Sequence, residues 1–322
     1  MSDSEKNNHP EIVTMLDRQA QNESGEDLLE KRVAMEQAVA KEMFKELLDT
    51  VDARYENLTE KTRADLMFHK NEVLDKAIEL GIRNGFSEKE LKTFEMAAIL
   101  HDISKADKAP AEYEHIDNYV LAMHGELAAA EVPALLTDAY LARIGFSEND
   151  FEDIRIQVAD AIRQHMGPHP GFMDFVLNGV NAKLREMGKS EIAHPEAVGK
   201  ISEALLATDM YSLADSNGRK KILSIRSENP GFIKTDEELC AEYAKHGVDL
   251  NRAEAALISG FDSAFQARDM IKDEKNREWM EQAIEESKYV AYDDGQGGKI
   301  NWGDVEMKKR LLEAAKKIRL AA

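Results

Sequence analysis

Four histidines and two aspartates in this sequence could together bind metal ions. Each lies on an otherwise apolar helical face or directly after an apolar run: His69, His101, Asp102, His124, His165 and Asp209. A single histidine on an apolar face is more often a hydrogen-bonded core residue than a ligand. Six such side chains, in a chain with nine histidines, are harder to explain in that way. Imidazoles and carboxylates without a thiolate suit Fe, Mn or Zn better than a soft metal.

The stretch EMAAILHDISKAD, residues 95–107, shows why a cation is expected. Residues 96–100 form an uninterrupted apolar run, which predicts a helix buried on most sides. His101 and Asp102 follow this run directly, so an imidazole and a carboxylate enter the core side by side. A buried charge needs a partner because water is not available to solvate it. A metal ion would be such a partner.

The other four side chains are placed by helical spacing. Residues three and four positions apart lie on the same helix face, and each of these four side chains continues an apolar series at such steps. The apolar partners are Leu66 and Val73 for His69, Val120 and Leu127 for His124, Ala161 and Ile162 for His165, and Leu205 and Leu213 for Asp209. All six side chains are therefore expected to point inward.

The elements that must position these side chains are helices. Runs of Ala, Leu, Glu and Lys with only seven prolines predict an all-α chain, and strand-like alternation is nearly absent. The expected helices cover about residues 27–56, 59–80, 88–102, 117–130, 148–166 and 195–215. The predicted division is a disordered tail at 1–26, an N-terminal helical segment at 27–59, a ligand-bearing helical bundle at 60–220 and a C-terminal helical accessory region at 221–322.

The tetrapeptide GFSE occurs twice, at residues 85–88 and 145–148. We interpret both copies as joints between helices and not as a functional repeat. In each joint the glycine would end one helix and the serine would cap the next. An acid follows three residues after the serine, Glu90 in one copy and Asp150 in the other.

Composition limits the cellular setting. A net charge of −20 argues against a general nucleic-acid or anionic-membrane binder, although one local cationic pocket could still hold a phosphate. Cys240 is the only cysteine, so disulfides are excluded and a reducing cytoplasm is expected. The N-terminal residues lack the apolar segment of a signal peptide, and no run approaches the length of a membrane span. We therefore expect a soluble, cytoplasmic protein.

The order of the six candidate ligands resembles that of the HD superfamily of metal-dependent phosphohydrolases. The signature of that superfamily is a histidine, a later His-Asp pair and a final aspartate, and two further histidines between them characterise its dinuclear members. The sequence HDISK at 101–105 is similar to the His-Asp-x-Gly-Lys form of the motif, with Ser104 where glycine is usual. The resemblance covers about residues 60–215 and leaves out the first 55 residues and the last hundred.

This resemblance implies an HD-type helical bundle that holds two divalent metal ions. The first ion would be held by four side chains, those of His69, His101, Asp102 and Asp209. Asp102 would bridge to a second ion carried by His124 and His165. Iron or manganese is expected, with magnesium, zinc and nickel as alternatives.

Two further residues bear on catalysis and substrate binding. Lys105 lies about one helical turn after Asp102, so it could reach a substrate phosphate. The alternative is an exposed lysine at a helix end. His169, in the stretch HMGPHPGF, is left undecided between a contact with substrate or metal and a plain loop position.

The superfamily implies hydrolysis of a phosphate ester or anhydride, most often of a nucleotide or dinucleotide, by a metal-bridging hydroxide. The acidic chain favours a small phosphorylated substrate over a polynucleotide. Two alternatives stay open: a mixed-valent di-iron oxygenase of the same fold, and a catalytically inactive ligand-binding protein. The sequence does not decide whether the flanking regions regulate, cover the site or form a homo-oligomer.

Two C-terminal motifs have simpler interpretations. Residues 293–304, DDGQGGKINWGD, resemble a calcium-binding EF-hand loop, but glycines occupy the third and fifth positions, where oxygen ligands belong. We therefore favour a glycine-rich turn. The tail KKRLLEAAKKIRLAA predicts a basic amphipathic helix that docks on the rest of the chain, in preference to a membrane surface.

Overall fold

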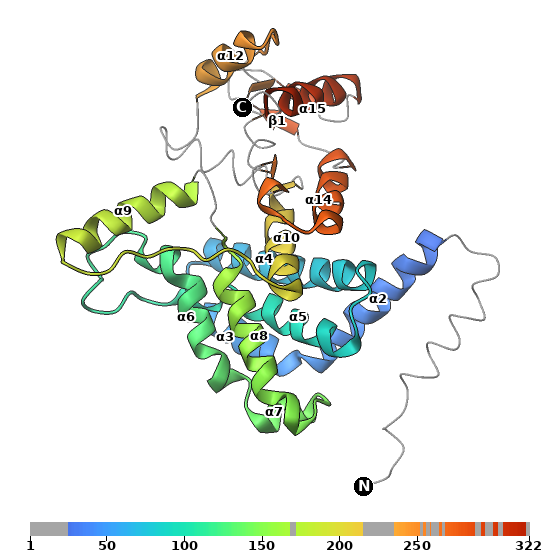
Figure 1. The fold of residues 1–322 in the computed structure, drawn as a ribbon, viewed down its shortest axis with the longest axis vertical. Coiled ribbons are helices and arrows are strands. Elements are labelled where there is room, and N and C mark those ends of the chain that lie inside the picture. The colour runs from blue at the N-terminus through green and yellow to red at the C-terminus, as the bar shows by residue number, and fades with distance from the viewer. Residues whose placement is uncertain are drawn as a thin grey trace.

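The computed structural model describes residues 25–167, 172–214, 235–251, 254, 255, 258, 264, 265, 268–286, 291–293, 299–301 and 305–319. The fold is all-α, as the sequence predicts, with one short β-hairpin in the described part (Figure 1). In chain order the elements are α2 (Gly25–Met43), α3 (Lys45–Tyr55), α4 (Glu60–Arg83), α5 (Glu88–Leu100), the 3₁₀ helix η1 (Ile103–Ala106), α6 (Tyr119–Leu135), α7 (Asp138–Arg143), the 3₁₀ helix η2 (Glu148–Asp150), α8 (Phe151–Gln164), α9 (Phe172–Glu186), α10 (Lys200–Ala214), α12 (Asp236–Lys245), α14 (Glu274–Glu286), β1 (Ala291–Asp293), β2 (Lys299–Asn301) and α15 (Val305–Arg319).

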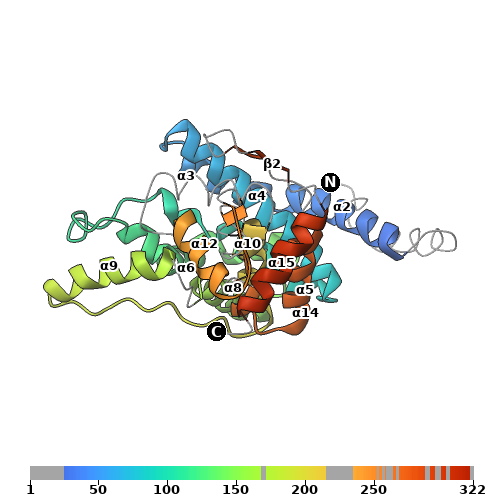
Figure 2. The same ribbon diagram turned by 90° about the horizontal axis from the view of Figure 1, so that it is seen from above.

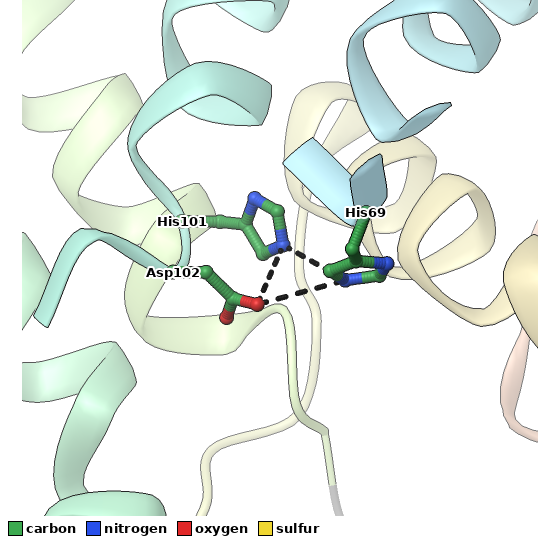
Figure 3. A group of neighbouring side chains, drawn as sticks. All are labelled: His69, His101 and Asp102. Atoms are coloured by element: carbon green, nitrogen blue, oxygen red, sulfur yellow. Dashed lines mark hydrogen bonds and ion pairs between the residues drawn. The ribbon is translucent and has the colours of Figure 1, made fainter. Parts of the chain in front are cut away.

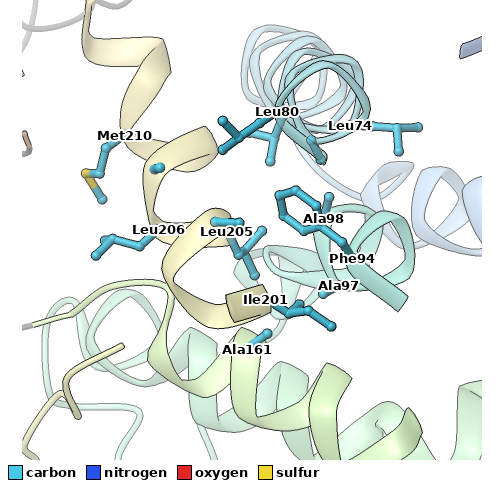
Figure 4. Packing of buried hydrophobic residues seen from close by; sticks show 14 of the residues in the cluster. Leu74, Leu80, Phe94, Ala97, Ala98, Ala161, Ile201, Leu205, Leu206 and Met210 are labelled. Carbon is cyan, nitrogen blue, oxygen red and sulfur yellow. The ribbon is translucent and has the colours of Figure 1, made fainter. Parts of the chain in front are cut away.

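The centre of the molecule is helix α5, which packs against α4, α8 and α10. Its run from Met96 to Leu100 is fully buried, as the uninterrupted apolar sequence predicts. Figure 4 shows the layer in which Leu205 of α10 meets Phe94 and Ala98 of α5, with Leu80 of α4 beside them. Full burial of one such leucine or phenylalanine side chain stabilises the fold by about 1.5–3 kcal/mol. This packing fixes the helices that carry most of the candidate ligands.

The first GFSE joint has the predicted geometry. Gly85 adopts a left-handed φ of 64°, and Ser87 caps α5. The Ser87 hydroxyl accepts a hydrogen bond from the Glu90 N–H, and the Glu90 carboxylate accepts one from the Ser87 N–H. This reciprocal pair is a capping box, which satisfies two of the unpaired donors at the helix start.

The second GFSE joint differs in one respect. Gly145 is again left-handed, with φ of 92°, but Ser147 makes no capping hydrogen bond through its side chain. The chain instead enters the 3₁₀ turn η2, in which the Asp150 N–H donates to the Ser147 carbonyl. The Asp150 carboxylate pairs with Lys89 at 2.7 Å. The predicted side-chain cap at Ser147 is therefore wrong.

The N-terminal segment forms two helices where the sequence predicted one. The break lies at Phe44, which has φ of −98° and ψ of 14° and is fully buried. Beyond it, Leu47, Val51 and Tyr55 of α3 enter the same hydrophobic core as α4 and α5. The hydrophobic core thus includes residues on both sides of the boundary predicted at residue 59. The division into domains stays a prediction.

Two described helices, α7 and α9, were not predicted. In α9, Val176, Val180 and Leu184 repeat at steps of four and are buried in a small second core with Tyr119 and Ala122. Figures 1 and 2 show α9 extending away from the main bundle. The pattern of α9 was visible in the sequence, but its core is separate from the one that the ligands occupy.

The C-terminal elements support both simpler interpretations. β1 and β2 form an antiparallel hairpin in which the backbone of Asp293 lies opposite that of Lys299, which agrees with a turn between two strands. Residues 294–298 and 302–304 lie outside the described residues. In α15, Leu311 and Ala315 are buried in the main core, and Arg310 pairs with Glu254. The tail helix therefore docks within the chain.

The prediction that the chain lacks a membrane span can be checked on the helices that the structure describes. Among these helices, none is both long and apolar enough to cross a bilayer.

Candidate metal centre

The six predicted ligands come together from the helices of the main bundle. His69 is on α4, His101 and Asp102 lie at the junction of α5 and η1, His124 is on α6, His165 ends α8, and Asp209 is on α10. Figure 3 shows the imidazoles of His69 and His101 facing the carboxylate of Asp102. The helical spacing thus located the side chains correctly.

The first group contains three side chains that could share one ion, with Asp209 beside two of them. The Nε2 atoms of His69 and His101 are 3.4 Å apart. The Oδ2 atom of Asp102 lies 3.6 Å from the first of these nitrogens and 3.4 Å from the second. Oδ1 of Asp209 lies 2.9 Å and 3.8 Å from the same two atoms. Ligands bound at about 2.1 Å, with angles of roughly 90–109°, are separated by about 3.0–3.4 Å, so most of these spacings suit a single ion.

The second group lies on the other side of Asp102. Here the Nε2 atoms of His124 and His165 are 3.0 Å apart. They lie 3.4 Å and 3.8 Å from Oδ1 of Asp102. These three side chains also fit one ion, with fewer protein ligands than the first group has.

Asp102 presents one carboxylate oxygen to each group. Its Oδ1 atom is buried and accepts no hydrogen bond from the part of the chain that the structure describes. A buried acceptor without a partner costs about 1–3 kcal/mol, and more when it is charged. A cation between Oδ1 and the two imidazoles would remove this cost. The residues present therefore form two groups that could each hold a metal ion, and Asp102 belongs to both.

The three innermost histidines are oriented by the main chain. Each Nδ1 lies within hydrogen-bonding distance of the carbonyl oxygen three residues earlier: His101 to Ala98 at 2.7 Å, His124 to Leu121 at 2.7 Å and His165 to Ile162 at 2.5 Å. If Nδ1 carries the proton, Nε2 is left with a free lone pair. This hydrogen bond is the usual support of a metal-binding histidine.

The local electrostatics keep most of these imidazoles neutral. Burial lowers the pKa of His69, lowers that of His124 far below its usual value, and lowers that of His165 to about 4. Burial also acts to lower the pKa of His101, but attraction to Asp102 outweighs it and the pKa is raised. Neutral imidazoles are the form that binds a metal.

Both carboxylates stay ionised. Burial opposes this, but His101 and Lys105 hold the pKa of Asp102 well below its usual range. For Asp209 the hydrogen bond from His69 likewise outweighs burial and lowers the pKa. Lys105, 2.7 Å from Asp102, offsets part of the negative charge of these two buried carboxylates, and a bound cation would offset more.

Of the two residues expected to meet substrate, one can be placed. Lys105 follows Asp102 in η1, and its Nζ lies 2.7 Å from Oδ2 of Asp102. Its side chain is 23% exposed, so the ammonium group lies at the edge of the site. The hydroxyl of Ser104 donates to the His124 carbonyl and joins η1 to α6. His169 lies outside the described residues.

Two other histidines stay away from the cluster, as predicted. His115 is exposed in the loop before α6. His194 was expected at a helix start, but α10 begins only at Lys200. Its Nε2 lies 2.9 Å from the Ala122 carbonyl, a backbone partner that gives it a structural role.

Sequence reasoning missed Gly125, which sets the distance between α6 and α8. A Cβ atom at this position would lie 3.1 Å from the Ile162 carbonyl oxygen and 3.5 Å from Cε1 of His165. A side chain at this position would require α6 and α8 to move apart by a few tenths of an ångström, at the place where His124 meets His165. Because the signal is one glycine beside one candidate ligand, it could be recognised only after the helix pairing was known.

Comparison of the chain with protein-family models, with curated proteins and with solved structures gives no match.

Proposed function

We propose that this chain is a metal-dependent phosphohydrolase that cleaves a phosphate ester or anhydride, with a nucleotide or dinucleotide as substrate. The observation that carries the proposal is the carboxylate of Asp102, whose two oxygens face two separate groups of imidazole nitrogens. When bound, two divalent ions would polarise the phosphoryl group and supply a hydroxide nucleophile near neutral pH.

The residues of the chain have distinct roles in this proposal. Asp102 would hold both ions at one fixed separation, and the imidazoles would complete the two ligand sets. Lys105 would bind a phosphoryl oxygen and offset the charge that develops there. Its partial exposure allows it to turn from Asp102 towards a substrate. The net charge of −20 supports a small substrate over a polynucleotide, because a nucleic-acid backbone would be repelled.

The direct test is phosphate release from a nucleotide panel with the protein loaded with Mn²⁺ or Fe²⁺. Lys105→Met should retain the bound metal and lose activity by roughly 10²–10³-fold, the usual effect of removing one donor to a developing oxyanion. Lys108→Met is the matched control, because Lys108 is an exposed lysine three positions further on. No phosphate release from any member of the panel would refute the proposal.

The same ligand set is compatible with di-iron oxygen chemistry, so the panel is run with and without oxygen. Full activity with Mn²⁺ under anaerobic conditions supports hydrolysis. Oxygen consumption that requires iron and an organic substrate would replace this proposal with an oxygenase.

A further inference from the structure

Helix α3 precedes residues 60–215, to which the resemblance to metal-dependent phosphohydrolases is confined. Its last turn nevertheless contacts the candidate metal centre. Three of its residues, within four positions, reach three different elements that carry ligands. These residues are Asp52, Arg54 and Tyr55.

Tyr55 contacts the bridging residue itself. Its side chain is fully buried, and its hydroxyl donates a hydrogen bond to the Asp102 carbonyl at 3.1 Å. The N–H of Lys105 donates to the same carbonyl at 3.0 Å. Both lone pairs of this oxygen are therefore used, and the peptide plane after Asp102 cannot rotate without breaking a buried hydrogen bond.

This fixed peptide matters because Asp102 has an uncommon backbone conformation. Its φ of −110° and ψ of 6° lie in the sparsely populated bridge region, where residues of active sites are often found. The backbone angles set the direction of the carboxylate. That direction is balanced, since Oδ2 lies 3.4 Å from the nearest imidazole of the first group and Oδ1 lies 3.4 Å from that of the second. A small rotation would favour one group over the other.

Arg54 holds the far end of the same segment. It pairs with Asp107, the residue that follows η1, at 3.0 Å. Its other terminal nitrogen contacts Glu131 on α6, the helix that carries His124. Consecutive residues of α3 thus hold the start and the end of the segment from Asp102 to Asp107.

Asp52 completes the set of contacts. It pairs with Lys70, whose side chain is 2% exposed and which directly follows His69 in α4. A buried lysine without its carboxylate partner would be strongly destabilising, so this pair fixes the position of α3 beside α4.

We propose that α3 is a brace of the metal centre and that Tyr55 is a positioning residue, which keeps the Asp102 carboxylate shared equally between the two ligand groups. The inference rests on the proposed dinuclear function but concerns a segment and a residue that the function does not require. It predicts that one hydroxyl group outside the ligand set determines whether the second ion binds tightly.

The test compares Tyr55→Phe with Tyr140→Phe. Tyr140 is the matched control, because it is also buried and its hydroxyl has no hydrogen-bond partner among the described residues. In the Mn²⁺-loaded full-length protein, Tyr55→Phe should weaken binding of the more loosely held ion by about 10–100-fold, as for other supporting residues of metal ligands. The electron paramagnetic resonance signal should change from that of a coupled manganese pair towards that of isolated Mn²⁺. Tyr140→Phe should change neither property.

A second measurement does not depend on metal binding. Amide hydrogen exchange in the metal-free protein should become faster in residues 101–107 for Tyr55→Phe and stay unchanged there for Tyr140→Phe. Arg54→Gln, a change at a partly exposed side chain, should have the same effect without disturbing the core. Arg185→Gln is its control, since Arg185 pairs with Glu191 at 3.0 Å on the surface and does not contact α3.

The outcomes separate this inference from the proposed function. Wild-type metal affinity, spectrum and exchange in Tyr55→Phe would overturn the inference and leave phosphohydrolase activity untouched. If Tyr55→Phe fails to fold, Arg54→Gln decides in the same way. A wild-type protein that binds two ions but releases no phosphate would refute the proposed function. The proposed role of α3 in positioning Asp102 would not be affected.

Discussion

Replacing His124 with alanine removes one of three protein ligands from the second group and none from the first. The first group keeps four side chains, whereas the second keeps only Asp102 and His165. A structural metal site held by four ligands contributes about 10–16 kcal/mol, which is roughly 3 kcal/mol for each ligand. Loss of about 3 kcal/mol raises the dissociation constant of the second ion by roughly a hundredfold. We therefore expect His124→Ala to bind one metal ion per chain, against the two proposed for the wild type.

The assay is elemental analysis after desalting, with the free energy of unfolding measured in parallel to confirm folding. His115→Ala should keep both ions, because His115 is exposed and away from the cluster. His194 is a poorer control than its sequence position implies, since it contacts the Ala122 carbonyl on the helix that carries His124. Asp102→Ala should lose nearly all metal. If His124→Ala binds as much metal as the wild type, the dinuclear arrangement is wrong and the site is mononuclear.

Three further predictions concern packing, pH and metal removal. Gly125→Ala should bind one ion, because its Cβ would press on the Ile162 carbonyl. Gly179→Ala is the control and should bind two ions, because a Cβ there meets nothing within 4 Å. Elemental analysis distinguishes the two variants. Burial raises the pKa of Glu95 well above its usual value, so the folded state favours the protonated carboxyl. The stabilisation from this carboxyl is complete below about pH 4. It is lost as the pH rises through the folded-state pKa, because the unfolded chain ionises more easily. Denaturant unfolding at several pH values should show this loss in the wild type and not in Glu95→Gln, which should be the more stable protein at high pH. Chelation should lower the melting temperature. Mn²⁺ at a hundred times its dissociation constant should restore about 2.7 kcal/mol of the free energy of unfolding. A melting curve unaffected by chelator would argue against a bound metal.

The ligand side chains could be predicted because each depends on local periodicity. Whether His69 or His165 points inward is decided by the apolar residues three and four positions away, and these are printed in the sequence. The capping box at Ser87 is equally local, since donor and acceptor are three residues apart.

Contacts between helices could not be predicted in the same way. Tyr55 continues the apolar series Leu47 and Val51 at steps of four, so it looks like one more core residue. Its hydrogen bond to Asp102 joins residues 47 positions apart and depends on how α3 packs beside α5. The role of Gly125 also depends on the approach of two helices. Periodicity shows which face is buried but not what that face meets.

The unequal exposure of the two ligand groups has a kinetic consequence. The side chains of His69 and Asp209 are 12% and 10% exposed, whereas those of His124 and His165 are 1% and 0% exposed. An ion held by the first group would lie nearer to solvent, beside these two partly exposed side chains. An ion held by the second group would be enclosed by side chains that are almost fully buried, so its exchange with solvent would be slower. The two positions would therefore load in order, and the inner ion would be retained long after the outer one had been replaced.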